Sequence, residues 1–172
     1  VLLNHTVYLL DALHRLNPEL LKNDWFLNQT FQYHALFGLL TRELMRLGIV
    51  QPAFIAGYFG LVVLLQWGWF RLVPALGGNA ATFIVSEIIW QLFAAGTGLG
   101  MYQFLQDSCF LPSNISAIAM LWGIALWLEG RKTSAGISFA VAAALHLNYA
   151  LATLAVWPAM LAYELWSRRR LD

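Results

Sequence analysis

The sequence predicts an all-α, polytopic membrane protein. Of its 172 residues, 60% are hydrophobic and only 11% are charged, and a water-soluble domain of this length could not bury so much apolar surface. Long uncharged stretches follow a more polar N-terminal part. We therefore expect an extracytoplasmic loop with interfacial amphipathic helices over residues 1–50, and about five transmembrane segments over residues 51–172, as part of a longer protein.

Charge and cysteine content narrow the range of partners. The net charge is +1, and no basic stripe occurs along the chain, so a nucleic-acid partner is not expected. Cys109 is the single cysteine, which excludes an internal disulfide framework. The expected partner is the lipid bilayer, and the expected location is the bacterial inner membrane, as an integral multi-pass protein.

The first amphipathic helix is predicted between His5 and Leu16. Its apolar residues recur at near-helical spacing opposite Asp11, His14 and Arg15, a pattern typical of a helix lying at a membrane interface. The sequence Asn17-Pro18-Glu19 then indicates a new helix start, because asparagine is a favoured cap, proline suits the first turn and an acid suits the positive end of the helix dipole.

The segment from Pro18 to His34 is the only long one that is dense in both hydrogen-bonding and ionisable side chains, with Asp24 in its middle. We expect a polar loop beside the membrane in which Asp24 is a candidate catalytic acid. The alternative is a solvated surface loop without chemistry. A second amphipathic helix is expected between Tyr33 and Leu47, ending near Gly48.

The first two transmembrane segments are predicted from long apolar stretches. Ala53 to Phe70 contains no charge and is long enough to cross a bilayer, with two tryptophans and Arg71 as an interfacial collar at its end. The next segment is expected from Thr82 to Leu105. It carries Glu87, and because an acid at the centre of a span costs roughly 2.5 to 3.5 kcal/mol, we expect this residue near an end or facing protein.

The later segments are less uniform in length. Ile115 to Leu128 would be only about 21 Å long as a helix, so it should begin near Pro112 if it is to span the bilayer. Ala135 to Trp166 is either one tilted helix or two helices that meet at His146–Tyr149.

The distribution of basic residues decides between these two alternatives. The loop around Asp107 has no lysine or arginine, whereas several other ends of the predicted segments carry basic residues. These basic residues are Arg71, Arg131, Lys132 and Arg168–Arg170. They fall on one side of the membrane only if the chain turns at His146–Tyr149. The basic residues of the first loop, Arg15, Lys22, Arg42 and Arg46, are exceptions to this alternation. We therefore predict two helices, with Asp24, Asp107 and His146 all on the non-cytoplasmic side.

Neither a metal centre nor a nucleophilic serine is predicted. His5, His14, His34 and His146 lack the paired spacing of a zinc-binding helix, and a single carboxylate with scattered histidines is a poor divalent-cation site. No serine lies in a Gly-x-Ser-x-Gly motif. We expect no metal and no other cofactor.

Several features follow one another in a set order. An acid-bearing loop with interfacial helices is followed by Tyr102-Gln103-Phe104-Leu105-Gln106-Asp107 leading to Pro112, then by a helix closing on Gly130-Arg131-Lys132, then by a small-residue helix ending at His146. This layout resembles the N-terminal half of the membrane module in polytopic glycosyltransferases of the C superfamily (GT-C), which use polyprenyl-phosphate sugar donors. The resemblance covers most of the chain and rests on layout rather than on an invariant signature.

The resemblance implies transfer of a sugar from a lipid-linked donor to an extracytoplasmic acceptor. In that family a carboxylate in the first external loop acts as base or metal ligand, and Asp24 is the position here that best matches it. Family members often have two adjacent acids where this chain has Asn23-Asp24. Asp11 and His5 are therefore alternative counterparts.

The residues themselves also fit such a transfer. The reaction needs a base for the acceptor hydroxyl, and cationic or hydrogen-bonding groups for the leaving phosphate. Asp24 is the predicted base. The predicted substrate-binding residues are polar groups for the phosphate, aromatic rings for stacking on the sugar, and one further acid, namely Lys22, His34, Arg42 and His146, then Trp25 and Tyr33, and then Asp107.

Two other classes of function remain open at this point. In a transporter or flippase fragment, Glu87, Asp107 and His146 would line a polar pathway across the membrane, and the first loop would be a gate. In a structural membrane subunit, the chain would carry no chemistry.

Overall fold

The chain is almost entirely helical in the computed structural model, which describes residues 3–30, 34–94 and 109–168. Within these ranges the elements are α1 (Leu3–Leu16), η1 (Pro18–Leu21, a 3₁₀ helix), α2 (Trp25–Gln29), α3 (Ala35–Arg46), α4 (Val50–Ala75), α5 (Ala80–Ala94), α6 (Pro112–Leu128), α7 (Lys132–Leu145) and α8 (Leu147–Arg168), and none is a strand. The all-α prediction is confirmed for this part of the chain.

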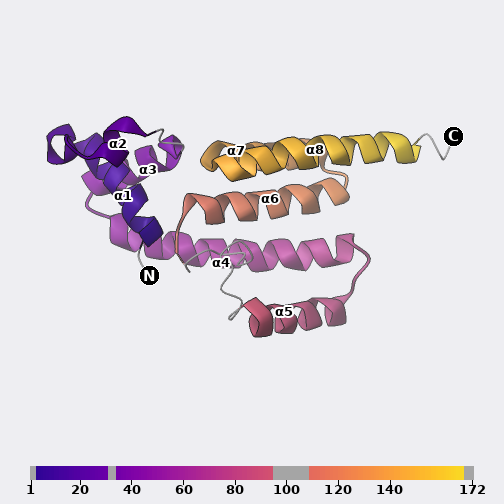
Figure 1. The fold of residues 1–172 in the computed structure, drawn as a ribbon. Helices are drawn as coiled ribbons and strands as arrows, with labels where there is room; N and C mark the ends of the chain where they lie inside the picture. Colours follow the sequence, from indigo (N-terminus) through magenta and orange to yellow (C-terminus); the bar gives the residue numbers. More distant parts are fainter. Residues whose placement is uncertain (1–2, 31–33, 95–108, 169–172) are drawn as a thin grey trace.

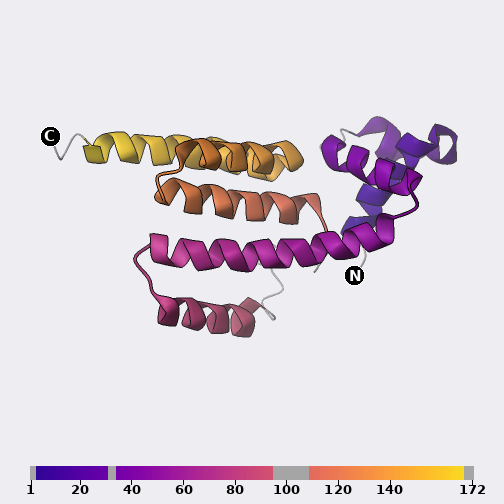
Figure 2. The same cartoon turned by 180° about the vertical axis from the view of Figure 1, so that it is seen from behind.

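The long helices lie side by side, and the N-terminal helices gather at one end of them. α4 crosses the middle of the molecule, with α5 on one side and α6, then α7 and α8, on the other (Figure 1). The view from behind shows the same order, with α1 to α3 beside the start of α4 (Figure 2). Successive long helices run in opposite directions, so alternate connections meet at the same end of the bundle.

The N-terminal polar segment is more ordered than a loop. Asn17 Oδ1 accepts the Glu19 amide at 3.3 Å and Pro18 opens η1, so the predicted start is confirmed as that of a short 3₁₀ helix. Asp24 Oδ1 accepts the Leu27 amide at 2.9 Å and caps α2. Short side chains with an acceptor oxygen favour helix starts, which explains why this segment folds into two short helices.

α4 is longer than the predicted span at both ends. It has 26 residues, about 39 Å at 1.5 Å per residue, whereas the hydrocarbon core of a bilayer is about 30 Å thick. Pro74 lies inside its last turn, and the chain reverses after it at Gly77, where φ is +85°. Within the described residues, α4 is the one helix that is both long and apolar enough to cross a membrane, judged by length and composition.

The remaining apolar helices are shorter. The apolar stretches Ala80–Trp90, Pro112–Leu128 and Lys132–Leu145 fall below the length of α4, so the prediction of about five transmembrane segments stays a prediction. α6 begins at Pro112, as predicted. The C-terminal part of the predicted Thr82–Leu105 span, from residue 95 onward, lies outside the described residues.

The stretch Ala135–Trp166 forms two helices, as predicted. The break is narrower than the predicted four-residue turn, because α7 ends at Leu145 and α8 begins at Leu147. His146 alone is extended, with φ −152° and ψ 127°.

α6 is the central helix of the bundle. It contributes more buried residues than any other helix among the described residues, and it packs against α4, α7 and α8. One core cluster joins α4 to α6 and includes Leu61, Leu65, Leu121 and Ala125, while a second joins α6 to α7 and includes Leu126, Trp127, Ala135 and Phe139. The Trp122 indole also donates to the Leu64 carbonyl at 2.9 Å, tying α6 to α4.

The two ends of the bundle differ in chemistry. We call the end that carries Arg71, Arg131 and Lys132 the basic end. There Arg71 Nε contacts Glu129 Oε1 at 2.8 Å, and Lys132 Nζ contacts Glu164 Oε2 at 2.7 Å. The other end holds the N-terminal helices and the break at His146.

The close approach of α6 and α7 gives a stability prediction. A Cβ on Gly123 would lie 2.9 Å from two ring carbons of Phe139, which is fully buried. Overpacking of this kind costs about 1–3 kcal/mol, more than the roughly 1 kcal/mol that alanine gains over glycine in a helix. We expect Gly123→Ala to lower the melting temperature in detergent by several degrees.

Gly60→Ala is the matched control, because nothing lies within 4 Å of the Cβ that it would add to α4. It should melt at or slightly above the wild-type temperature. Equal melting temperatures for the two variants would contradict the packing of α6 on α7.

Candidate functional site

The candidate site lies where the start of α3 meets the break between α7 and α8. The rings of His34 and His146, more than a hundred residues apart in sequence, have centroids 5.2 Å apart. His34 precedes the first turn of α3, and its ring also hydrogen-bonds the backbone of Leu145, at the end of α7. Terminal backbone groups of a helix need partners outside the helix, so this bond joins the N-terminal helices to the bundle.

α1 supplies the other side of the site. The Tyr8 ring meets the His34 ring edge to face, with centroids 4.5 Å apart. Asp11, three residues later on the same helix face, is 7% exposed, and both of its carboxylate oxygens lie 3.0 Å from Arg15 Nε. We call Tyr8, Asp11, Arg15, His34 and His146 the histidine site.

Gly38 lets α3 approach the Asp11 carboxylate. A Cβ at this position would collide with the carboxylate oxygen, and α1 and α3 pack closely here. The Asp11–Arg15 pair therefore lies between two helices, and a buried carboxylate is tolerated because a guanidinium neutralises it.

Both histidines are held in the neutral form. Burial and the nearby His146 lower the pKa of His34 to about 4, while Asp11 and the Leu145 backbone raise it by less. Burial also lowers the pKa of His146. At neutral pH these rings are hydrogen-bonding groups rather than cations, so Arg15 is the cation of the site.

His146 also begins α8. Its Nδ1 accepts the Asn148 amide at 3.3 Å, which is the bond that a helix cap makes. A neutral imidazole that accepts at Nδ1 carries its proton on Nε2. The hydrogen bond from the Asn148 amide therefore both caps α8 and fixes the tautomer of the His146 ring.

The structure brings together only part of the predicted site. His34 and His146 meet, whereas the contacts described for Asp24 are all within its own turn, with Leu21, Leu27 and Asn28. Asp107 and Tyr33 lie outside the described residues.

The other predicted donor-binding residues lie in local contacts on the surface of the N-terminal helices. Lys22 Nζ pairs with Glu19 at 3.1 Å, Arg42 Nε bonds Glu43 at 2.8 Å, and Trp25 is 65% exposed. None of these described contacts reaches the histidine site.

Tyr8 and Arg15 were not predicted, and Asp11 was only an alternative for the base. Their spacing of three and four residues, which places all three on one helix face, was visible in the sequence. This helix was assigned to a membrane interface from its sequence, and the packing of α3 against it was not predicted. Among the described residues, no three His, Cys, Asp or Glu side chains gather as a metal site would require.

No family model, curated protein or solved structure matches the chain. The functional argument therefore depends on the geometry of the site and on the distribution of apolar and charged residues.

The low pKa of His34 predicts a pH dependence of stability. Its value is 6.5 in the unfolded chain and about 4 in the folded protein, so protonation favours unfolding. Above about pH 6.5 the ring is neutral in both states and the protein has its full stability. As the pH falls toward 4, the ring is protonated in the unfolded chain first, and the free energy of unfolding decreases. We expect the melting temperature to drop across this window, and to drop less in His34→Gln, which cannot ionise. A pH profile in His34→Gln as steep as that of the wild type would contradict this assignment.

Proposed function

We propose that the chain crosses the membrane several times and transfers a sugar from a polyprenyl-phosphate donor to an extracytoplasmic acceptor at the histidine site. The observation that carries the proposal is the convergence of Asp11, Arg15 and two neutral histidines at the end of the bundle opposite the basic end. A carboxylate, a guanidinium and neutral imidazoles are the groups that such a transfer requires.

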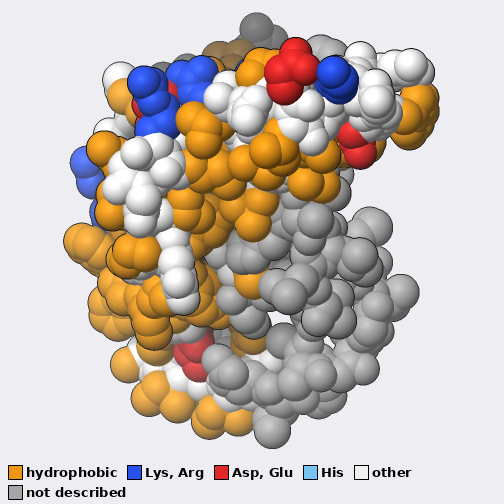
Figure 3. Space-filling view, turned by 90° about the vertical axis from the view of Figure 1, so that its left-hand side faces the viewer, with side chains coloured by type: hydrophobic (Ala, Val, Ile, Leu, Met, Phe, Trp, Pro, Cys, Tyr) orange, Lys and Arg blue, Asp and Glu red, His pale blue; other side chains and the backbone are white. Residues whose placement is uncertain are grey.

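Exposed apolar side chains support the membrane placement. They cover the outer faces of the long helices and include Ile55, Phe59, Val63 and Phe70 of α4, Ile84, Val85 and Ile88 of α5, and Leu151 and Leu154 of α8. Seen from the end formed by the N-terminal helices, charged side chains gather at the top of the view, above a broad hydrophobic area (Figure 3). Apolar surface on this scale suits contact with lipid.

The basic residues at one end of the bundle support a particular orientation in the membrane. The connections between long helices at the basic end carry Arg71, Arg131 and Lys132, and basic residues favour the cytoplasmic side. The N-terminal helices at the other end also carry basic residues, namely Arg15, Lys22, Arg42 and Arg46, so the orientation rests on the connections of the bundle alone. The histidine site would then face the non-cytoplasmic side, which is the side where an extracytoplasmic acceptor is found.

The residues suggest how the transfer would proceed. The acceptor hydroxyl oxygen forms the new bond to the anomeric carbon, its proton passes to Asp11, and the bond from that carbon to the phosphate oxygen breaks with its electron pair leaving on the phosphate. Arg15, whose side chain is 30% exposed, would hold the phosphate. Sharing the guanidinium with the phosphate would loosen its hold on Asp11 and make the carboxylate a better base.

Asp24 stays the alternative base, and the two candidates can be separated cleanly. Asp24 caps α2, and because asparagine caps a helix about as well as aspartate, Asp24→Asn should fold normally. We expect Asp24→Asn to keep near-wild-type transfer and Asp11→Asn to lose roughly 10²- to 10⁴-fold, the range typical of general-base catalysis.

The measurement is turnover of a polyprenyl-phosphate sugar by the full-length protein purified in detergent, with melting temperatures as the folding check. Loss of activity in Asp24→Asn alone would move the base to the cap of α2. Full activity in both folded variants would end the proposal that either carboxylate is the base.

The membrane orientation can be tested by cysteine labelling in a Cys109→Ser background. Gln51→Cys is exposed at the start of α4, near the histidine site, and Thr133→Cys is exposed at the basic end. A membrane-impermeant maleimide added to spheroplasts should label the first and should leave the second unlabelled until the membrane is breached. Labelling of Thr133→Cys from outside would reverse the orientation, and labelling of both would contradict the membrane placement.

One observation favours a transporter as a second candidate. Glu87 lies in apolar α5, and its Oε1 is buried with no hydrogen-bond partner among the described residues. Carboxylates within membrane segments often mark ion or proton pathways. Glu87→Gln should leave sugar transfer unchanged if the proposed function holds, whereas loss of a proton-coupled uptake activity would favour transport.

A further inference from the structure

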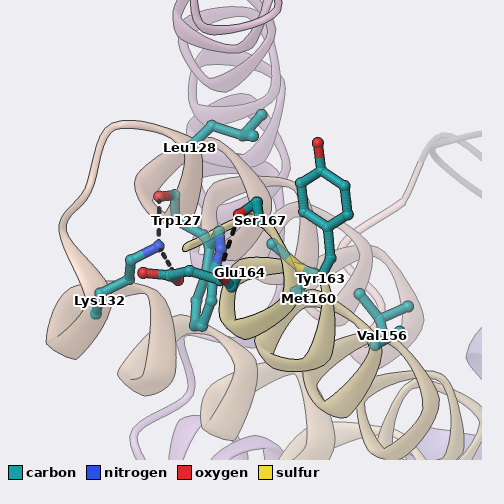
Figure 4. A pocket seen from close by; sticks show the side chains of 9 residues that line it. Trp127, Leu128, Lys132, Val156, Met160, Tyr163, Glu164 and Ser167 are labelled. Atoms are coloured by element: carbon teal, nitrogen blue, oxygen red, sulfur yellow. Dashed lines mark hydrogen bonds and ion pairs between the residues drawn. The ribbon is translucent and has the colours of Figure 1, made fainter. Parts of the chain in front are cut away.

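A second site lies at the basic end, beside α8. A cavity of about 500 Å³ opens there, within the size range of small-molecule sites, and is lined by residues that include Trp127, Lys132, Val156, Met160 and Glu164 (Figure 4). It is far along the bundle from the histidine site, because α7 and α8 separate the two along their lengths.

Lys132 forms the polar edge of this cavity. Its Nζ lies 2.7 Å from Glu164 Oε2, 3.4 Å from the Trp127 carbonyl oxygen and 3.8 Å from the centroid of the Trp127 ring. An ammonium group has three donors, and these two oxygens take two of them. The aromatic face fixes the position of the charge at the mouth of the cavity.

The rest of the lining is mainly apolar and forms two stripes along α8. Val156, Met160 and Tyr163 line the larger cavity. Trp157, Leu161 and Leu165 line a smaller one of about 310 Å³. Trp127, Lys132 and Glu164 border both cavities. One charged pair therefore stands at the junction of two adjacent apolar grooves, which matches the plan of a headgroup above two acyl chains.

The charge around this junction is positive. Among the described residues at the basic end, Arg71, Arg131 and Lys132 carry three positive charges, and Glu129 and Glu164 carry two negative ones. Basic pockets between membrane helices on the cytoplasmic side favour anionic lipid headgroups.

We propose that this site holds one anionic phospholipid of the bilayer, with its phosphate on Lys132 and its acyl chains in the two grooves of α8. The inference rests on the membrane placement proposed above, but not on the sugar-transfer chemistry. The lipid would fill the space between α6, α7 and α8 at the level of the headgroups and so hold α8 against the bundle.

The test is native mass spectrometry of the full-length protein titrated with phosphatidylglycerol in detergent, followed by the same titration with phosphatidylcholine. We expect saturable binding of one phosphatidylglycerol and weaker binding of phosphatidylcholine. Lys132→Met, which keeps most of the length of the side chain but not its charge, should weaken phosphatidylglycerol binding about fivefold, the effect expected for one lysine near a membrane surface.

Two further variants separate the effect of the charge on lipid binding from the effect of the apolar groove. Glu164→Gln removes the competing carboxylate and should bind phosphatidylglycerol as tightly as the wild type or more tightly. Ala159→Phe adds bulk to the lining of the larger cavity without changing any charge, and it should weaken binding of both lipids.

Arg71→Met is the matched control, because Arg71 also pairs with an acid, Glu129, and lies over a tryptophan, Trp122, at the same end. It should bind like the wild type. Equal effects of Lys132→Met and Arg71→Met, no effect of Lys132→Met, or preference for phosphatidylcholine would overturn the proposal. Release of the protein from membranes by alkaline carbonate would instead overturn the membrane placement, and sugar transfer is measured separately.

Discussion

The burial of α6 between α4 and α7 is the constraint on which the rest of the molecule depends. α6 has apolar or small side chains on nearly every face, so its sequence alone favours no single partner helix. Its apolar surface is buried only when other helices cover several of its sides. Gly68 on α4 and Gly123 on α6 remove the side chains that would otherwise meet Trp122 and Phe139. Close packing of antiparallel neighbours then decides which connections share an end of the bundle.

That arrangement gives the two ends different chemistry. At the basic end, Arg71 and Lys132 each pair with an acid and lie over a tryptophan face. At the other end the last carbonyls of α7 and the first amides of α8 are exposed by the break at His146. The imidazoles of His34 and His146 contact these backbone groups, so the same two rings that join the N-terminal helices to the bundle also line the candidate site.

Sequence reasoning found the features whose signals are local. Pro112 begins α6 and Asn17 caps the following helix, because proline and short acceptor side chains act within a few positions. The break at His146 was predicted instead from a comparison of basic residues between loops. The site was found only in part, since pairing of His34 with His146 depends on how α3 packs on α7. Asp24 was chosen because it stands in a polar segment, and helix capping explains that polarity without chemistry.

In the proposed sugar transfer, the neutral histidines decide which residue can supply the positive charge that binds the phosphate. A ring with a pKa of about 4 cannot meet a phosphate as a cation at neutral pH, so of the site residues only Arg15 brings a permanent positive charge. Arg15 stands one turn after Asp11 on α1, and each oxygen of that carboxylate already contacts it. The base and the phosphate anchor of the proposed reaction are thus a single ion pair in the resting protein. A donor phosphate that competes for Arg15 would therefore release Asp11 at the moment when a base is needed, which couples donor binding to activation of the acceptor.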